Sequence, residues 1–587
     1  MNSTGLIMVS LLIIIVLLVP YFMNYNKNLN RIKGVKTGDG QYGDAQFASR
    51  KELKDHFIKI EFEPAKWRNG LELPTVEGTI IGTEKVGRKY YILVDPSDNH
   101  TLVVSASGGG KTTSFVEPMI EYCAAAGMSV FSTDTKGNIY QDFAPVLRKY
   151  YHITSYLIDL RYPQASNSYN FLYLINKYYD SYKLTGNLGS AALAENYAKD
   201  MAYSIIHMDG LTNAGQNQFF YTAGEGVIAG ITLLVSELCE PSERHIASVF
   251  KCIRQLMEVD PSTLNKKNEQ PTLYITELYL MLPEDHTAKN LLAPTATTEF
   301  KTIASVMSTA MSLLLKFIDK EMEQILCFDD GFNIDDFTAG NSFIFFIIDE
   351  KSKAKNFMVN LILNQIYGEL LRKAEEYQDI RLPHRVYQIL DECGTFGKID
   401  GLARMLSAGR SRNIISVLPI QNLSQLDVSY GKDDATNIKS NCQNTMFSYL
   451  SSGSSDAITF SKALGTSTVQ VGSVSSQTSN NRSSSSITKS MTKKNLMSPE
   501  KITRMPKGDW VLMKSGMNPS QQKLIPAGQM GIEFNEKFKI EPRAIRTVKY
   551  ADRSELFEKI QEYYSAKTAK STHPTNVDKK KVSVDYL

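Results

Sequence analysis

A glycine-rich stretch at residues 103–113, VVSASGGGKTT, has the residue types of a phosphate-binding loop. Such a loop needs a strand ending in a turn of inward-pointing backbone N–H groups, a lysine that reaches the terminal phosphates, and a hydroxyl for Mg²⁺ where a helix begins. A β-rich run precedes the three glycines, and a lysine and two threonines follow them. The alternative is a glycine-rich turn with a chance lysine. We expect an ATP site with Mg²⁺. Its predicted members are Ser107, Gly108, Gly109, Gly110, Lys111, Thr112 and Thr113.

The loop departs from the usual pattern at its first position. Ser105 stands where that pattern has glycine. Serine is small, and this position shapes only the start of the turn. We therefore expect the loop to work in spite of the substitution.

Hydrolysis needs an aspartate that orders Mg²⁺ and usually a glutamate that orients the attacking water, both at the end of a buried strand. FIFFIIDE ends in Asp349 and Glu350, and RVYQILDE ends in Asp391 and Glu392. The first strand is more hydrophobic but continues into the charged KSKAKN. The second continues into a compact turn with two glycines, which suits a packed site. The pattern modestly favours the second pair, so Thr112 and Asp391 are the predicted Mg²⁺ ligands and Glu392 is the predicted catalytic carboxylate.

Short β-rich runs alternate with helical runs around these residues, which predicts a parallel sheet. Between residues 180 and 330 only helical patterns occur, including the apolar runs 219–238 and 300–318. The sequence therefore predicts an α/β, RecA-like P-loop ATPase domain interrupted by an all-α domain. The predicted strands are residues 90–94, 101–104, 128–134, 155–160, 342–348, 385–390, 413–420 and 445–450.

The N-terminus carries an apolar run at residues 6–23, about 27 Å of helix, which is close to the thickness of the membrane's hydrocarbon core. Basic residues follow this run and none precedes it, so the positive-inside rule places the N-terminus outside and the bulk of the chain in the cytoplasm. A cleaved signal peptide would need a basic start and a small-residue cleavage site, which are missing. We expect a single-pass anchor in the cell membrane.

The composition limits the classes of partner. The chain has 587 residues, enough for several domains, and a formal net charge of only +3, which argues against a globally basic nucleic-acid binder. Its six cysteines form no CxxC pair, so a zinc site or a disulfide framework is not expected. Any nucleic-acid contact must therefore be local, such as a channel lining.

Four stretches, taken in order, resemble the type IV coupling protein family, the membrane-anchored ATPases of conjugation and type IV secretion. YGDAQFASRKEL resembles the family's motif after the membrane segment, and DTKGNIY resembles its Asp-x-Lys-Gly motif. ILDECGTFGKIDGLARMLSAGRSRNIISVLPIQNLSQL resembles the acidic strand, the arginine segment and the glutamine strand end. NLMSPEKITRMPKGDWVLM resembles the C-terminal signature. The resemblance covers most of residues 38–523.

The resemblance implies a homo-hexameric ring with ATP between subunits. It implies that Arg410 or Arg412 reaches the neighbouring subunit's γ-phosphate, and that Gln421 senses that phosphate or positions water. Asp134 and Lys136 either support the site or only shape a turn. Asp349 and Glu350 take a non-catalytic place. The chain departs from the family pattern at Ser105, at Asn138, where glutamate is common, and in having one membrane helix where many members have two.

The function that the resemblance implies is ATP-driven delivery of a relaxase-bound single DNA strand to a type IV secretion channel. The implied partners are single-stranded DNA held by its backbone, relaxase or relaxosome proteins, channel components and the membrane. The alternatives are another hexameric membrane DNA translocase or secretion-channel ATPase, and a receptor that binds ATP without turnover. The helical insertion argues against the first, and the presence of Lys111 with both acidic residues argues against the second.

The predicted domain boundaries follow the changes of pattern. They are an anchor at 1–24, a cytoplasmic linker at 25–72, the nucleotide-binding domain at 73–179 and 331–545, the all-helical domain at 180–330, and a C-terminal helix with a basic disordered tail at 546–587. Residues 466–490, rich in serine, are predicted to be a mobile loop.

Overall fold

The computed structural model describes residues 40–208, 217–264, 271–329, 332–349, 353–394, 398–479 and 482–572. The predicted anchor at 6–23 and the tail from 573 lie outside these residues.

A nine-stranded sheet forms the centre of the molecule, in the order β14-β13-β10-β4-β9-β8-β5-β7-β6. The strands from β10 to β6 are parallel, and β13 and β14 add an antiparallel edge. This confirms the predicted α/β class. The strands are β4 Thr101–Ser105, β5 Ser129–Asp134, β6 Thr154–Asp159, β7 Ser342–Ile347, β8 Val386–Leu390, β9 Ile414–Ile420, β10 Asn444–Ser448, β13 Asp509–Lys514 and β14 Ser520–Lys523.

The sheet is buried on both faces, which explains why its strands are continuously apolar in the sequence. Along β4, Leu102 and Val104 belong to one hydrophobic core and Val103 to the other, because successive side chains point to opposite faces. Helices α15 (Lys353–Ala374), α16 (Leu402–Gly409), α17 (Ser424–Tyr430), α18 (Lys432–Asn441) and α19 (Asp456–Ala463) contribute to the first core. The second core contains α4 (Glu117–Ala125), α5 (Asn138–Tyr150) and a small sheet of β1 (Ile58–Glu61), β3 (Lys89–Asp95) and β2 (Thr79–Val86).

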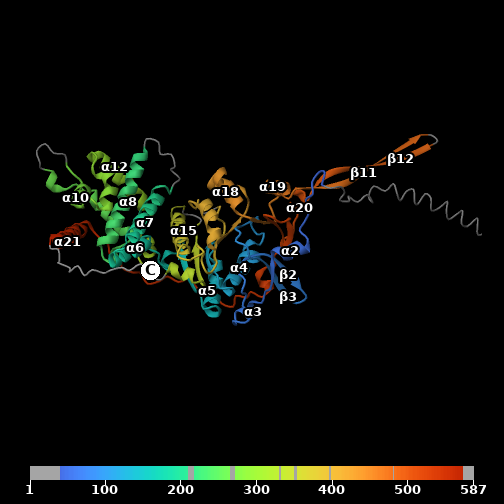
Figure 1. Cartoon of the computed structure of the whole chain (residues 1–587), viewed down its shortest axis with the longest axis horizontal. Helices are drawn as coiled ribbons and strands as arrows, with labels where there is room; N and C mark the ends of the chain where they lie inside the picture. Colours follow the sequence, from blue (N-terminus) through green and yellow to red (C-terminus); the bar gives the residue numbers. More distant parts are fainter. Residues whose placement is uncertain are drawn as a thin grey trace, which may run out of the picture.

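All helices of the inserted domain lie at one end of the elongated molecule (Figure 1). Among the described residues, α8 is the one helix long and apolar enough to cross a membrane, but 67% of its most apolar window is buried inside this domain. It therefore serves as the core helix that its neighbours cover. The helices are α6 Tyr173–Thr185, α7 Leu188–Ile206, α8 Gln218–Leu238, α9 Ile246–Leu256, α10 Tyr274–Met281, α11 Thr287–Ala296, α12 Phe300–Leu314 and α13 Met322–Leu326, followed by α14 Ile334–Thr338.

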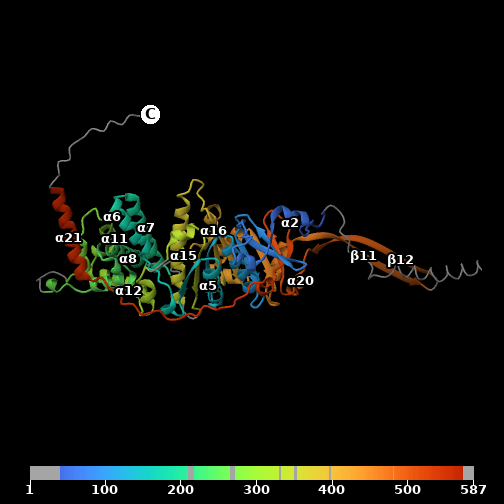
Figure 2. The same cartoon turned by 90° about the horizontal axis from the view of Figure 1, so that it is seen from below.

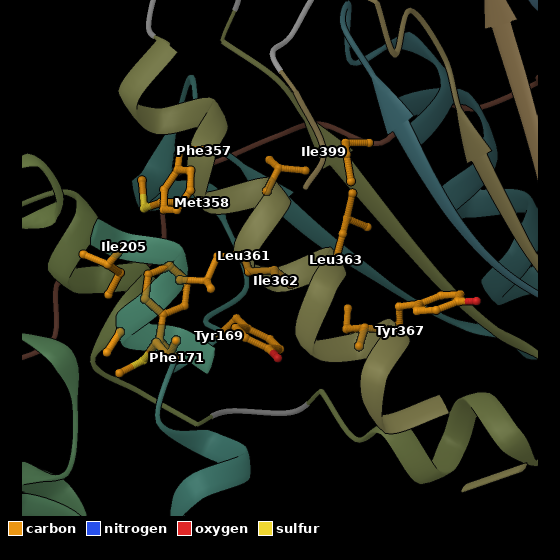
Figure 3. Close-up of a cluster of buried hydrophobic side chains, with 14 of the residues drawn as sticks. Tyr169, Phe171, Ile205, Phe357, Met358, Leu361, Ile362, Leu363, Tyr367 and Ile399 are labelled. Carbon is orange, nitrogen blue, oxygen red and sulfur yellow. The ribbon is translucent and has the colours of Figure 1, made fainter. Parts of the chain in front are cut away.

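The helical domain and the sheet domain share one hydrophobic core. Figure 3 shows Phe357 and Leu361 of α15 beside Phe171 and Ile205 from the helical side. The ring of Phe317 lies 6.1 Å from that of Phe171 and 5.8 Å from that of Phe357, measured between centroids. The insertion is therefore packed against the sheet domain and not merely tethered to it.

Two predicted boundaries are corrected. The linker predicted at 25–72 is wrong from Arg50 onward, because α2 (Arg50–His56), β1 and α3 (Pro64–Trp67) fold there, and Trp67 is buried. The loop predicted at 466–490 is wrong as well: β11 (Thr466–Ser479) and β12 (Arg482–Asn495) pair as a long hairpin. Val471 and Met491, two of its few apolar residues, are exposed, and the serine-rich composition gave no sign of strands.

A C-terminal strap, residues 533–552, runs from the sheet domain along the molecule to the helical domain and continues into α21 (Arg553–Thr572) (Figure 2). At its start, the Phe538 backbone N–H donates to Gln141 O (2.7 Å) and Lys537 pairs with Asp142 (2.9 Å). At its end, the Arg546 guanidinium stacks 3.8 Å from the centroid of Phe328. The strap thus joins α5 of the sheet domain to the helical domain.

Candidate nucleotide-binding site

The glycine-rich loop connects the carboxyl end of β4 to a short π-helical turn, Thr112–Val116, and then to α4. Gly108 and Gly110 have φ angles of 72° and 93°, in the left-handed region that side chains disfavour. The strand, loop and helix that the sequence predicts are therefore present in order, with the loop's N–H groups at the start of a helix.

Ser105 packs directly under Gly109. A Cβ at Gly109 would lie 2.1 Å from Ser105 Oγ, so glycine is required there. Ser105 is fully buried, and its hydroxyl has no hydrogen-bond partner among the described residues. The serine at the first loop position is thus accommodated because Gly109, which lies against its hydroxyl, has no side chain.

Lys111 points back into the loop and toward the acidic strand end. Its Nζ donates to Ser105 O (2.6 Å) and lies 3.7 Å from Glu392 Oε1. Burial lowers the pKa of Lys111, and the charges of Glu392 and Asp391 oppose that shift. The ammonium is therefore held where an incoming polyphosphate can replace its present partners.

Asp391 and Glu392 follow β8, two strands from β4. Burial, and then the charge of Glu392, raise the pKa of Asp391 to about 7. Its Oδ1 is buried without a hydrogen-bond partner in the described part of the chain. An unpaired buried carboxylate oxygen on the rim of a phosphate loop fits a Mg²⁺ ligand, since Mg²⁺ prefers carboxylate and phosphate oxygens.

Gln421, at the end of β9, reaches Glu392 directly. Its Nε2 lies 3.2 Å from both carboxylate oxygens, and its own backbone N–H donates to Gln425 Oε1 (2.9 Å). The Glu392 backbone has φ 57° and its N–H donates to Pro419 O, which ties the turn after β8 to β9. The amide of Gln421 therefore orients the carboxylate that the sequence assigns to catalysis.

A cavity of about 400 Å³ lies between the loop, the acidic turn and the start of α5. It is lined by all seven predicted loop residues and by Asp391, Glu392, Asp134 and Lys136. Asp134 accepts four backbone N–H bonds from residues 136–140, so it shapes the turn, while Lys136 is exposed at the cavity. Sequence reasoning missed Glu117 and Asp142, which also line the cavity. They belong to no motif and come together because α4 and α5 pack into the same core beside the sheet.

The structure does not bring Arg410 and Arg412 to this cavity. They precede β9, at the opposite edge of the parallel sheet, about 20 Å from its carboxyl end. Arg410 is exposed and donates through Nε to Asp98 O, whereas Arg412 donates to Ala408 O. Asp349 follows β7, and the strands β9, β8 and β5 separate β7 from the loop strand β4. Glu350 lies outside the described residues.

The chain matches the family model described as Type IV secretory system Conjugative DNA transfer over residues 61–525. It is 26% identical over 196 residues to the conjugal transfer protein TraG of Agrobacterium fabrum (strain C58 / ATCC 33970). That alignment spans 32% of this chain and only 28% of the relative.

Among solved structures, the chain resembles the bacterial conjugative coupling protein TrwB, at 14% identity. The unbound form gives a TM-score of 0.51 and covers 86% of this chain and 98% of that chain. A complex of TrwB with the GTP analogue GDPNP gives 0.52, with 86% and 99% covered. A third structure holds ADP and Mg²⁺ and gives 0.50, with 86% and 99% covered. These likenesses show the shared fold. Because the family model spans most of the chain, the chain belongs to the type IV secretory system conjugative DNA transfer family.

Proposed function

We propose that this chain is an ATP-driven coupling protein, which recruits a relaxase-bound single DNA strand and feeds it to a type IV secretion channel. The observation that carries the proposal is the convergence of Lys111, Asp391 and Glu392 on one cavity at the carboxyl edge of the sheet, with Gln421 bonded to Glu392 behind it. Solved TrwB complexes with nucleotide analogues and with ADP and Mg²⁺ support a nucleotide in that place.

Each residue has a definite task in this proposal. The loop N–H groups and Lys111 bind the phosphates, and Thr112 and Asp391 hold Mg²⁺, which neutralises charge that develops on the transferred phosphoryl group. Glu392 accepts a hydrogen bond from the attacking water and orients it, while Gln421 holds Glu392 in position. Loss of Glu392 or of Gln421 should therefore stop hydrolysis without preventing ATP from binding.

The proposal extends to partners and location. The chain works as a homo-hexamer, anchored in the cell membrane by residues 6–23 with its bulk in the cytoplasm. The helical domain receives the relaxase, and single-stranded DNA is gripped by its backbone without base specificity, which suits transport of any sequence.

The first test is ATP turnover by the purified full-length chain. Lys111→Ala removes the phosphate-binding ammonium, and we expect hydrolysis to fall to background, a loss of at least about 10²-fold. Radiolabelled ATP hydrolysis with and without single-stranded DNA measures this. Turnover that survives the change would refute the site, and a wild-type chain that binds ATP without any turnover would identify a receptor and not a motor.

The second test separates the two acidic pairs. Glu392→Gln keeps the shape of the side chain but removes its charge, so we expect the variant to bind ATP and retain it without hydrolysis. Glu350→Gln is the matched control and should hydrolyse ATP normally. The reverse pattern would assign catalysis to the strand that ends at Asp349.

A further inference from the structure

The hairpin formed by β11 and β12 is a two-stranded sheet that stands away from the body of the molecule (Figures 1 and 2). Each strand has 14 residues, so the hairpin is about 45 Å long. The chain fixes only its base: Asp44 bridges Ser467, and the Thr468 N–H donates to Gly43 O (2.9 Å). Within the described residues, no further strand joins this sheet.

Such a hairpin has little to stabilise it alone. More than half of its strand residues are serine or threonine, and they occur on both faces, so neither face can bury a core. A lone two-stranded hairpin is marginally stable in water. Beyond the base, where residues 43–45 bond to β11, no other strand covers either outer edge in the described part of the chain. An exposed strand edge offers backbone N–H and C=O groups to a further strand.

The two edges differ in charge. Strand β11 has no charged residue and no proline, and its pairing with β12 is continuous without a bulge, so it lacks the devices that natural edge strands use against pairing. Strand β12 carries Arg482, Lys489, Lys493 and Lys494 and no acidic residue. Two β12 edges would place like charges side by side, which is unfavourable, whereas a β11 edge accepts a β12 edge without that cost.

We propose that the hairpins of neighbouring copies pair edge to edge, β11 of one copy with β12 of the next, and close a β-barrel with a polar inner and outer surface. Pairing between unlike edges is head-to-tail, which generates a ring when the rotation from copy to copy closes. Each copy contributes two strands, all hairpins point the same way, and all bodies lie at one end. Antiparallel pairing of two β11 strands would instead place two bodies at opposite ends of the hairpins.

The inference rests on the proposed function in one respect: a ring in one membrane requires all bodies at one end. It assigns the hairpin to assembly of the ring around a hydrophilic passage. Closure removes both edges, and each copy gains backbone hydrogen bonds on two sides that a separated copy lacks.

The inference is tested by crosslinking introduced cysteines with a bis-maleimide, in membranes that contain the full-length chain. All six native cysteines are buried, so the reagent reacts with the introduced thiols. A span of about 10 Å is long enough to join them even if the polar strands pair in more than one register. Val471 on β11 is 40% exposed, and Ser490, its pairing partner on β12, is exposed on the same face of the hairpin. We expect dimeric products when Val471→Cys and Ser490→Cys chains are co-expressed, at least about tenfold above either variant alone.

Controls make each outcome decisive. Leu184→Cys, at an 86% exposed position of the helical domain, measures random collision and should match the single variants. Crosslinking of Val471→Cys alone would show β11–β11 pairing and overturn the inference, as would products no more abundant than with Leu184→Cys. The same crosslinks are expected in a Lys111→Ala background. Crosslinks between the two cysteine variants, together with no ATP hydrolysis by the wild-type chain, would overturn the proposed motor and leave the barrel standing.

Discussion

At the scale of single residues, the site combines groups whose ordinary chemistry has been altered by burial. Burial lowers the pKa of Lys111 while the charges of Glu392 and Asp391 oppose that shift, and Asp391 retains its proton to higher pH than an exposed aspartate. Burying such groups lowers the stability of the fold. It also leaves the lysine and the aspartate ready to bind phosphate and Mg²⁺ in place of their present surroundings. The cavity therefore stores an unfavourable arrangement of charge that its ligands relieve.

Glu117 gives a prediction about pH. Burial, and then the charge of Asp142, raise its pKa from 4.5 to about 7, while Lys537 opposes the shift. The folded chain thus holds a proton that the unfolded chain has released, and stability falls as pH rises from about 4.5 to about 7. Glu117→Gln should stabilise the chain by about 1–3 kcal/mol at pH 8 and by much less at pH 5, measured by thermal unfolding. An equal effect at both pH values would contradict the assignment.

Gly109 and Ser105 give a second prediction at this scale. Gly109→Ala should weaken ATP binding about tenfold or more, because its Cβ would overlap Ser105 Oγ. Ser105→Gly removes that oxygen, so the double variant should regain most of the affinity, and Ser105→Gly alone should change little. Calorimetric titration with an ATP analogue measures all three. Additive losses in the double variant would show that the two residues act independently.

At the scale of elements, the parallel sheet brings together strand ends that are far apart in the chain, and the strap connects this edge to the helical domain. Lys537 at the start of the strap pairs with Asp142, which also lines the nucleotide cavity. Gln324, at the far end, exchanges hydrogen bonds with the backbone of Arg546. A covalent segment thus connects the wall of the nucleotide cavity to the helical domain.

The strap's distal attachment is testable. Arg546→Ala removes the stacking on Phe328 and a 2.8 Å hydrogen bond to Gln324 O, which should lower the free energy of local opening by about 2 kcal/mol. Hydrogen exchange should therefore accelerate in α13 but not in β8. Lys539→Ala is the matched control, since Lys539 is 84% exposed and pairs with the exposed Glu541. Unchanged exchange in α13 would mean that the core alone holds the domain.

At the scale of the whole molecule, the residues that the sequence assigns to catalysis lie at two opposite edges of the sheet. The carboxylates, the lysine and the glutamine lie at one edge of the sheet, and the two candidate arginines lie at the other. The exposed guanidinium of Arg410 is the better donor to a neighbouring subunit, because Arg412 is half-buried and bonded to its own helix. A head-to-tail ring would bring opposite edges of neighbouring sheets together.

Mixing variants tests this arrangement. Arg410→Ala and Glu392→Gln chains should each lack ATPase activity, yet mixed assemblies should recover part of it. An interface that combines Glu392 of the first variant with Arg410 of the second contains both groups. Arg412→Ala in place of Arg410→Ala should give a partner that is active by itself. No recovery on mixing would place the arginine's role within its own chain.

The sequence alone determined which residues could do the chemistry and which runs would be the parallel strands of the central sheet. Lys111, Asp391 and Gln421 each follow a short apolar strand, and local pattern suffices for such signals because backbone sterics and periodicity act over a few residues. The α/β class and the helical insertion followed from the same patterns.

The tertiary structure decided what depends on contacts between distant segments. The strand order separates Asp349 from the loop and places Gln421 beside Glu392, although both acidic pairs end similar strands. Glu117 enters the cavity through helix packing, and the serine-rich stretch becomes a hairpin through backbone pairing that its composition conceals. Which strands and helices become neighbours depends on how both faces of the sheet are buried, and a local sequence pattern does not encode that arrangement.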